Sequence, residues 1–338
     1  MLMGKTILEV VNLKKHFLQR RGLFSALRGQ EGMIPAVDDV SFYLKEHETL
    51  GLVGESGSGK TTVGRTILGL PPATSGKILF DGRDITALSP RDFRPLRKEM
   101  QMIFQDLDAA LNPKMRIRAI LKEAISVHQD INGARLDWKV GELLEQVNLK
   151  ESKLTNFPHE LSGGEKRRVG IARALAVGAR FLVADEPTSA LDVSIQAQVV
   201  NLLKDLQKNL GLSYLFISHD LRIVELVSHK VAVMYLGKIV EMGLANRIAE
   251  EPRHPYTHIL WSSLVEKESR EAPGTSSGGK SDDWGVFDFE RPYRGCRFAP
   301  RCPVYQERGR PEKCTDPSTE PHLHNIGEAH KVACHFPL

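Results

Sequence analysis

The sequence predicts an α/β protein built around a mostly parallel β-sheet. Two observations support this fold class. From Ile7 to about Met242, short apolar runs typical of strands alternate with segments of helical periodicity, and such alternation favours a sheet covered by helices on both faces. One apolar run also leads directly into a glycine-rich loop and a helix, an arrangement that turns backbone N–H groups toward an anion.

Length and charge limit the function classes. The 338 residues suffice for one large domain with an appendage, or for two domains. A net charge of +4 gives no broad electrostatic reason to expect nucleic acid as a partner. No apolar run is long enough to predict a membrane-spanning helix, and residues 1–15 lack the apolar core of a signal peptide. We therefore expect a cytoplasmic protein that reaches a membrane only through a partner or its own surface.

The predicted elements follow from local patterns. Apolar runs predict strands at residues 7–17, 36–44, 49–53, 77–80, 181–184, 212–217, 231–235 and 238–241, the last two as a hairpin. Helices are predicted at residues 61–70 and 195–210, and Gly211 ends the second. Residues 18–34 are predicted to be an irregular insertion, whose basic stretch 20–28 we interpret as a solvated surface loop.

The strongest motif lies between the predicted strand 49–53 and the helix that follows it. It is the phosphate-binding P-loop pattern, made of Gly54, Glu55, Ser56, Gly57, Ser58, Gly59, Lys60 and Thr61, with Thr62 next in the helix. The glycines let successive N–H groups face the phosphates, and Lys60 supplies a cation for the β- and γ-phosphates. The hydroxyl of Thr61 is expected to be a ligand for Mg²⁺. The motif therefore predicts binding of ATP with Mg²⁺.

A second motif supplies two carboxylates. The apolar strand predicted at 181–184 ends in Asp185 and Glu186. Asp185 is placed to reach Mg²⁺ directly or through water, and Glu186 to polarise the attacking water as general base. Together with the P-loop, this order of residues predicts ATP hydrolysis with Glu186 as the catalytic base.

A third motif predicts a second anion-binding surface, at the start of an Arg- and Ala-rich helix. Ser162 is the expected N-cap, and Gly163 and Gly164 leave N–H groups exposed at the helix N-terminus. A P-loop protein already cradles its own phosphates. We therefore expect this surface to close on the γ-phosphate of a nucleotide held by another subunit.

These motifs resemble those of the ATP-binding subunits of the ABC transporter family, over roughly residues 7–260. The resemblance implies a P-loop NTPase of ABC type, with a RecA-like parallel-sheet core, an antiparallel β subdomain and an α-helical subdomain. It also implies a head-to-tail dimer with two nucleotides between the subunits. Glu165 stands where the family more commonly has Gln, but the preceding serine and glycines are present. The residues implied to act across the dimer interface are Ser162, Gly163, Gly164 and Asp192.

The resemblance implies further residues of the ATP site. Gln105 corresponds to the Q-loop residue that senses Mg²⁺, so the implied Mg²⁺ ligands are Thr61, Gln105 and Asp185. His219 corresponds to the switch histidine that contacts the γ-phosphate, and it is implied to be catalytic with Gln105. Phe17 corresponds to the aromatic residue that stacks on adenine.

Other segments narrow the resemblance to the oligopeptide/dipeptide importer branch. These are residues 252–257, 295–303 and 332–335, while residues 100–105 and 214–218 resemble the F-type ATPase of that branch more than its D-type relative. The branch implies two transmembrane permease subunits, a second ATP-binding subunit of D type in a heterodimer, and an extracytoplasmic substrate-binding protein that acts indirectly. The implied location is the cytoplasmic face of the cell membrane, as a peripheral protein.

Related functions share these motifs. They include importers of nickel, glutathione or sugars, exporters with separate membrane subunits, and soluble ABC ATPases of DNA repair or translation. A translation factor normally carries two cassettes in one chain and a repair ATPase a long coiled-coil insertion, and the sequence shows neither. The function that the resemblance implies is ATP-driven import of oligopeptides or dipeptides, with no nucleic acid as partner. An importer of nickel, glutathione or sugars, or an exporter, is the alternative.

The chain divides into three expected parts. They are an ATP-binding domain at residues 1–262, with its helical subdomain at about 106–178, a linker at 263–292 and a C-terminal four-cysteine extension at 293–338. The linker is expected because residues 266–283 are rich in Ser, Gly, Glu and Lys.

All the cysteines lie in the C-terminal extension, and they are Cys296, Cys302, Cys314 and Cys334. Disulfides are unfavourable in a reducing cytoplasm. Zinc sites favour close Cys pairs, which this sequence lacks. Alternative zinc ligands near the cysteines are His322, His324, His330 and His335. An iron–sulfur cluster tolerates irregular loops between four thiolates, and the peptide-importer resemblance also implies a structural four-iron four-sulfur (4Fe-4S) cluster. Zinc and free thiols are the alternatives.

Overall fold

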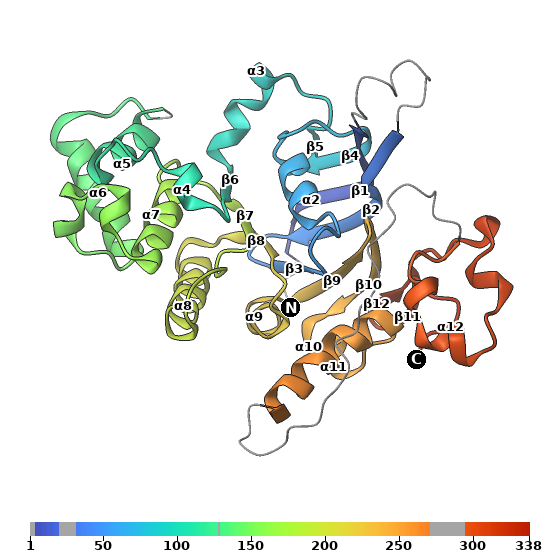
Figure 1. The fold of residues 1–338 in the computed structure, drawn as a ribbon. Helices are drawn as coiled ribbons and strands as arrows, with labels where there is room; N and C mark the ends of the chain where they lie inside the picture. Colours follow the sequence, from blue (N-terminus) through green and yellow to red (C-terminus); the bar gives the residue numbers. More distant parts are fainter. Residues whose placement is uncertain (1–3, 20–31, 128, 271–294) are drawn as a thin grey trace, which may run out of the picture.

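Two β-sheets organise the chain (Figure 1). The computed structural model describes residues 4–19, 32–127, 129–270 and 295–338. The basic stretch 20–28, predicted to be a surface loop, lies outside the described residues, as does the part of the expected linker beyond residue 270.

The larger sheet carries the sequence motifs. Its strands, in spatial order, are β11 (His324–Gly327), β12 (His330–Val332), β10 (Lys238–Leu244), β9 (Lys230–Tyr235), β3 (Thr49–Val53), β8 (Ser213–Ile217), β7 (Phe181–Asp185) and β6 (Met100–Ile103). The run from β9 to β6 is parallel, and β3, β7 and β8 are buried at every position. Strands buried on both faces are apolar throughout, which is why continuous apolar runs predicted them.

The smaller sheet is antiparallel. Its strands, in spatial order, are β2 (Gly32–Lys45), β1 (Thr6–Gln19), β4 (Ser75–Phe80) and β5 (Arg83–Asp84). The pairing of β1 with β2 includes Leu18 with Met33 and Gln19 with Gly32. The prediction that residues 18–34 form an irregular insertion was therefore wrong at both ends. Pairing between β1 and β2 continues past the apolar residues that mark each strand in the sequence.

Helices pack on the larger sheet and form a lobe of their own (Figure 1). The lobe contains α4 (Leu107–Ala110), α5 (Ile117–Ser126), α6 (Gly133–Gln146) and α7 (Gly163–Leu175). The other α-helices are α2 (Lys60–Ile67), α3 (Pro90–Phe93), α8 (Val193–Leu210), α9 (Leu221–Val227), α10 (Ala245–Glu250), α11 (Pro255–Arg270) and α12 (Pro303–Glu307). Thus α11 runs into the segment expected to be a linker. None of the described helices is both long and apolar enough to cross a membrane.

Two hydrophobic cores lie on opposite faces of the larger sheet, and the alternation along β7 shows this. Leu182 and Ala184 belong to the core that includes the helical lobe. Phe181 and Val183 belong to the core shared with the smaller sheet and α2. Because successive side chains of a strand point to opposite faces, one strand contributes to both cores.

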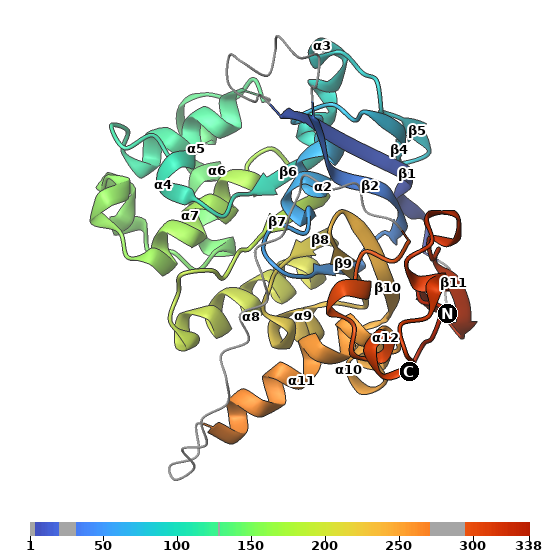
Figure 2. The same cartoon turned by 45° about the vertical axis from the view of Figure 1, so that its right-hand side comes forward.

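The C-terminal extension packs against the rest of the protein. β12 joins the larger sheet by pairing with β10, and β11 lies outermost. At the chain end, the backbone N–H of Leu338 donates to the carbonyl oxygen of Arg253 at 2.9 Å, and Nη1 of Arg253 donates to the carbonyl oxygen of Leu338 at 2.7 Å. Figures 1 and 2 show the extension beside β10 and α11 in both views.

A buried carboxylate fixes this contact. Glu241 on β10 is fully buried and accepts hydrogen bonds from the backbone N–H groups of Arg253 at 2.7 Å and His254 at 2.8 Å. It also accepts a hydrogen bond from Nε2 of His330 on β12, at 2.7 Å. These donors replace the water that the carboxylate loses on burial. Glu241 therefore joins the sheet, the start of α11 and the extension at one point.

Replacing Glu241 with Ala should lower the free energy of unfolding by about 3 kcal/mol, because its buried donors, among them His330, lose their acceptor. Urea unfolding followed by circular dichroism measures the loss. As a control, Glu251→Ala removes an exposed carboxylate that pairs with Arg247 and Arg253, and it should cost less than about 1 kcal/mol. Equal losses in the two variants would contradict the role given to Glu241.

Candidate nucleotide-binding site

The P-loop is a tight turn between β3 and α2. Gly59 has a φ of 102°, and a Cβ atom at this position would lie 2.1 Å from the carbonyl oxygen of Ala36. Only glycine fits there. α2 begins at Lys60, and no side chain caps its N-terminus. The N–H groups of its first turn are therefore left for an anionic ligand.

Lys60 is folded into the P-loop. Its Nζ donates to the carbonyl oxygens of Gly54 at 2.7 Å and Glu55 at 2.8 Å, and the residue is buried. Burial lowers the pKa of Lys60, while the carboxylates of Glu186, Asp185 and Glu55 act in the opposite direction. The ammonium group is thus held at the loop, where phosphate oxygens can replace its carbonyl acceptors.

Asp185 and Thr61 meet at the end of β7. The hydroxyl of Thr61 donates to Oδ1 of Asp185 at 2.8 Å. Asp185 is fully buried, and its Oδ2 has no hydrogen-bond partner among the described residues. Burial raises the pKa of Asp185, and the hydrogen bond from Thr61 partly opposes this shift. A buried carboxylate oxygen without a partner, beside a hydroxyl, fits a ligand set for Mg²⁺.

Two polar side chains, those of Gln105 and His219, contact the carboxylate of Glu186. Nε2 of Gln105 donates to Oε2 of Glu186 at 2.7 Å, and Nδ1 of His219 lies 3.0 Å from Oε1. Glu186 has a φ of 45°, in the left-handed region that residues other than glycine seldom adopt and that often marks functional sites. The three residues follow β6, β7 and β8, which are neighbours in the sheet. Such a group is able to orient a water molecule and accept its proton.

Two of the residues expected to act across an interface, Ser162 and Asp192, cap helices in this chain. Oγ of Ser162 accepts from the backbone N–H of Glu165 at 3.3 Å, and Oε2 of Glu165 accepts from the backbone N–H of Ser162 at 3.0 Å. A Cβ atom at Gly164 would lie 2.7 Å from the side chain of Ile195 on α8, so close helix packing also requires this glycine. Asp192 caps α8 by accepting from the backbone N–H of Ile195 at 2.9 Å. Within the described residues, no hydrogen bond joins Ser162 or Asp192 to the P-loop.

Gly163 and Phe17 come from two other elements, α7 and β1. Gly163 is the first residue of α7. Phe17 lies on β1, and its side chain is exposed. Nζ of Lys15 lies 5.1 Å from the centroid of the Phe17 ring, so the ammonium group lies over one face of the ring. The exposed ring is accessible for stacking.

Arg167 on α7 was not predicted as a site residue. It is buried and donates to the carbonyl oxygens of Phe104 at 2.8 Å, Gln105 at 3.3 Å and Ser189 at 3.4 Å. It therefore fixes the backbone at Gln105 and links it to the loop after Glu186. In the sequence it is one of several arginines in the same helix, and only knowledge of the buried face would have distinguished it.

The four cysteines lie in the extension as free thiols. The pKa of Cys296 is raised to about 11 and that of Cys334 to about 12, chiefly by burial, and the neighbouring cysteines act in the same direction. Backbone N–H groups oppose the shift at Cys296, Cys302 and Cys334. Among the residues that the structure describes, no group of three or more His, Cys, Asp or Glu side chains is arranged to hold a metal ion.

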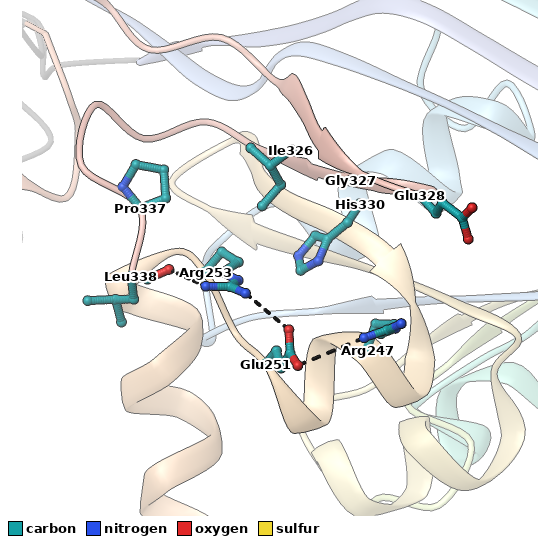
Figure 3. Close-up of a pocket in the computed structure, with 9 residues that line it drawn as sticks. All are labelled: Arg247, Glu251, Arg253, Ile326, Gly327, Glu328, His330, Pro337 and Leu338. Atoms are coloured by element: carbon teal, nitrogen blue, oxygen red, sulfur yellow. Dashed lines mark hydrogen bonds and ion pairs between the residues drawn. The ribbon is translucent and has the colours of Figure 1, made fainter.

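A cavity of about 470 Å³ lies between the β11–β12 hairpin, α10 and the chain end (Figure 3). Arg253 reaches across it to Glu251 and to the carbonyl of Leu338, and His330 points into it from β12. No residue of the P-loop and neither Asp185 nor Glu186 lines this cavity. It marks the contact between the extension and the sheet, apart from the candidate nucleotide site.

Comparisons with known proteins identify the family. A family profile described as "ABC transporter" matches residues 37–189, and one described as "Oligopeptide/dipeptide transporter, C-terminal region" matches residues 240–308. The chain is 44% identical to the oligopeptide transport ATP-binding protein AppF of Bacillus subtilis (strain 168), over 98% of both chains. The chain belongs to the oligopeptide/dipeptide branch of the ABC transporter ATP-binding family. It is also 48% identical to the oligopeptide transport ATP-binding protein OppF of the same strain, over 78% of this chain and 83% of the relative.

Solved structures confirm the predicted fold class. The structure of cbiO1 from Clostridium perfringens, described as part of the ABC transporter complex cbiONQ, matches with a TM-score of 0.63 and 25% identity over 80% of this chain and 96% of the other. A dimeric ATP-binding cassette in a post-hydrolysis state, bound to ADP and Pi, matches with a TM-score of 0.62 and 25% identity over 70% and 98%. This family member therefore has the P-loop NTPase fold of ABC type.

Asp185→Asn should remove the Mg²⁺ dependence of ATP binding. With Mg²⁺ present, the apparent Kd for ATP should rise about tenfold or more, because the oxygen that fits the ion loses its charge. In EDTA the Kd should stay equal or fall, since one negative charge near the phosphates is gone. Titration with a fluorescent ATP analogue under both conditions measures the two values. A loss of equal size with and without Mg²⁺ would contradict the ligand role.

Proposed function

We propose that this chain is the ATP-hydrolysing subunit of an importer for oligopeptides or dipeptides. ATP-driven closure of a dimer of ATP-binding subunits drives separate membrane permease subunits. The observation that carries this proposal is the meeting of Gln105, Glu186 and His219 at neighbouring strand ends. The cargo class is supported by relatives whose names specify oligopeptide transport.

ATP binding is the first step of the proposed reaction. The N–H groups of the P-loop and the ammonium of Lys60 bind the phosphates, and Phe17 stacks on the adenine ring. Thr61, Gln105 and Asp185 would hold Mg²⁺, which neutralises phosphate charge when it is bound. The orphaned Oδ2 of Asp185 and its hydrogen bond with Thr61 support this assignment.

Hydrolysis then depends on Glu186. Its carboxylate accepts a proton from the attacking water, while Gln105 fixes the orientation of one carboxylate oxygen. His219 lies 3.0 Å from the other oxygen of Glu186 through its Nδ1, and its proposed role is to contact the γ-phosphate. The left-handed backbone of Glu186 supports a functional reason for its position, because such strain persists where the surroundings impose it.

A second subunit completes each ATP site in this proposal. Ser162, Gly163 and Gly164 contact the γ-phosphate of ATP held by the opposite subunit, and Asp192 reaches across the same interface. The capping pair of Ser162 and Glu165 holds the start of α7, where the helix dipole favours an anion. The similar cassette solved with ADP and Pi is dimeric, which supports this arrangement.

The proposed partners follow from the family. They are two transmembrane permease subunits, a second ATP-binding subunit of D type, and an extracytoplasmic substrate-binding protein that acts indirectly. The proposed location is the cytoplasmic face of the cell membrane, as a peripheral subunit. The match of residues 240–308 to a region characteristic of oligopeptide/dipeptide transporters supports these assignments.

The extension holds a 4Fe-4S cluster in this proposal, through Cys296, Cys302, Cys314 and Cys334. Two features support it: neighbouring cysteines raise the pKa of Cys296 and of Cys334, and backbone N–H groups are directed at Cys296, Cys302 and Cys334. Hydrogen bonds to the sulfurs are a feature of iron–sulfur centres. Zinc is the weaker alternative, because a single ion requires a tighter ligand group than the described residues form. When bound, the cluster would supply covalent links among short loops.

Glu186→Gln should retain ATP binding and lose hydrolysis by about a hundredfold or more, since general-base catalysis contributes that much. The variant should accumulate as an ATP-bound dimer, because the closed dimer reopens only after ATP is hydrolysed. ATPase assays and size-exclusion chromatography measure both effects, and uptake of a labelled oligopeptide by cells that carry the variant should stop.

Lys60→Ala is the matched comparison, because it should weaken ATP binding itself. Near-normal ATPase activity of purified Glu186→Gln would show that another group is the base. Unchanged peptide uptake in cells whose only copy carries Glu186→Gln would contradict the proposed cargo.

Cys302→Ser should abolish the visible absorption expected of the proposed cluster. Anaerobically purified parent protein should be brown with broad visible absorption, as expected of thiolate-bound iron–sulfur centres. The variant should lose this colour and its extension should become more sensitive to protease. Iron and sulfide analysis measures the content directly. Colourless anaerobic protein that contains one equivalent of zinc would contradict the cluster and favour zinc.

A further inference from the structure

The P-loop is clamped by the C-terminal extension. Nη1 of Arg301 donates to Oε2 of Glu55 at 2.8 Å, and Nη2 donates to Oε1 at 2.9 Å. Two parallel bonds of this kind are the strong geometry between guanidinium and carboxylate. Glu55 is the second residue of the P-loop, and it stands 246 positions before Arg301 in the chain. The clamp therefore ties the extension to the loop that binds phosphates.

The segment of the extension that carries Arg301 is anchored by a cluster of buried aromatic rings. The ring of Phe298 lies 5.3 Å from that of Tyr235 and 5.4 Å from that of Tyr256, measured between centroids, and all three side chains are buried. Tyr256 also contacts the P-loop, since its hydroxyl accepts from the backbone N–H of Glu55 at 2.9 Å. Glu55 is thus held at its backbone and at its carboxylate by residues that follow the ATP-site motifs.

The charge of Glu55 matters because its site must bind a polyanion. Burial lowers the pKa of Lys60, and Glu55 is one of the carboxylates close enough to oppose that shift. A carboxylate in the P-loop also repels the phosphates that this loop binds. The side chains of Arg301 and Glu55 are 19% and 34% exposed, so solvent screens their charges only in part. Pairing with Arg301 cancels the repulsion.

We propose that Arg301 is a positioning residue of the ATP site. By pairing with Glu55 it cancels the carboxylate charge at the P-loop, so that the docked extension raises the affinity for ATP. The inference rests on the proposed ATP site and is independent of any metal in the extension. It gives the extension a direct effect on nucleotide binding in addition to its place at the sheet edge.

Arg301→Gln in the full chain tests this inference. The Kd for ATP with Mg²⁺ should rise about three- to tenfold, the effect expected of one uncancelled charge across a partly solvated site. The kcat at saturating ATP should stay within about twofold, because the groups at Glu186 are untouched. Titration with a fluorescent ATP analogue and steady-state ATPase assays measure the two quantities.

A second substitution separates charge from simple loss of structure. Adding Glu55→Gln to Arg301→Gln should return the Kd to within about twofold of the parent value, because no charge is left to cancel. Arg308→Gln is the matched control. It removes the same charge from an exposed side chain of the extension, which stacks on Phe336, and it should leave the Kd unchanged.

Several results would overturn the inference. They are an unchanged Kd in Arg301→Gln, a loss that Glu55→Gln does not reverse, and an equal loss in Arg308→Gln. If circular dichroism shows that Arg301→Gln does not fold, Glu55→Gln alone decides: it should bind ATP more tightly than the parent, and equal or weaker binding overturns the inference. Absence of ATP binding by the parent protein would instead contradict the proposed function.

Discussion

Parallel pairing of β3, β8, β7 and β6 is the constraint on which the candidate ATP site depends. Parallel strands end at one edge of a sheet, so the P-loop, His219, Glu186 and Gln105 reach the same place from segments far apart in the chain. The register fixes the match, because Ile217 of β8 pairs with Leu52 of β3 on one side and with Asp185 of β7 on the other. A slip of one residue would turn Asp185 away from Thr61. The sheet therefore sets the geometry before any ligand binds.

The sequence indicated the parts of this arrangement that have local signals. Three local patterns each predict an element without knowledge of the rest: the glycines around Lys60, the apolar run before Asp185, and the helical pattern at residues 195–210 that ends at Gly211. The clamp between Glu55 and Arg301 has no such local signal. Arg301 reaches the P-loop only because the aromatic rings around Phe298 pack the extension against the rest of the fold. The same limit explains why the joining of β12 to β10 was not predicted. The roles assigned across the dimer interface stay predictions.

Several candidate residues also stabilise the fold of this chain. Ser162 and Asp192 cap the N-termini of α7 and α8, and Gly164 permits the close approach of these two helices. Glu165 completes the cap of α7 through a side-chain oxygen, a role that Gln can also perform. This accounts for Glu at that position without loss of the serine and glycines. The packing of this chain thus fixes the start of α7, where the second anion-binding surface is predicted.

The pairing of β12 with β10 has a consequence for how the protein avoids self-association. β10 is largely buried, and without a neighbour it would present unpaired backbone N–H and C=O groups along an apolar strand. Such edges recruit strands from other molecules. The extension covers this edge and leaves β11, a short and fully exposed strand, as the new border of the sheet. A chain that ended before residue 295 would keep every ATP-site motif, but it would leave the edge of β10 open to pairing with strands of other molecules.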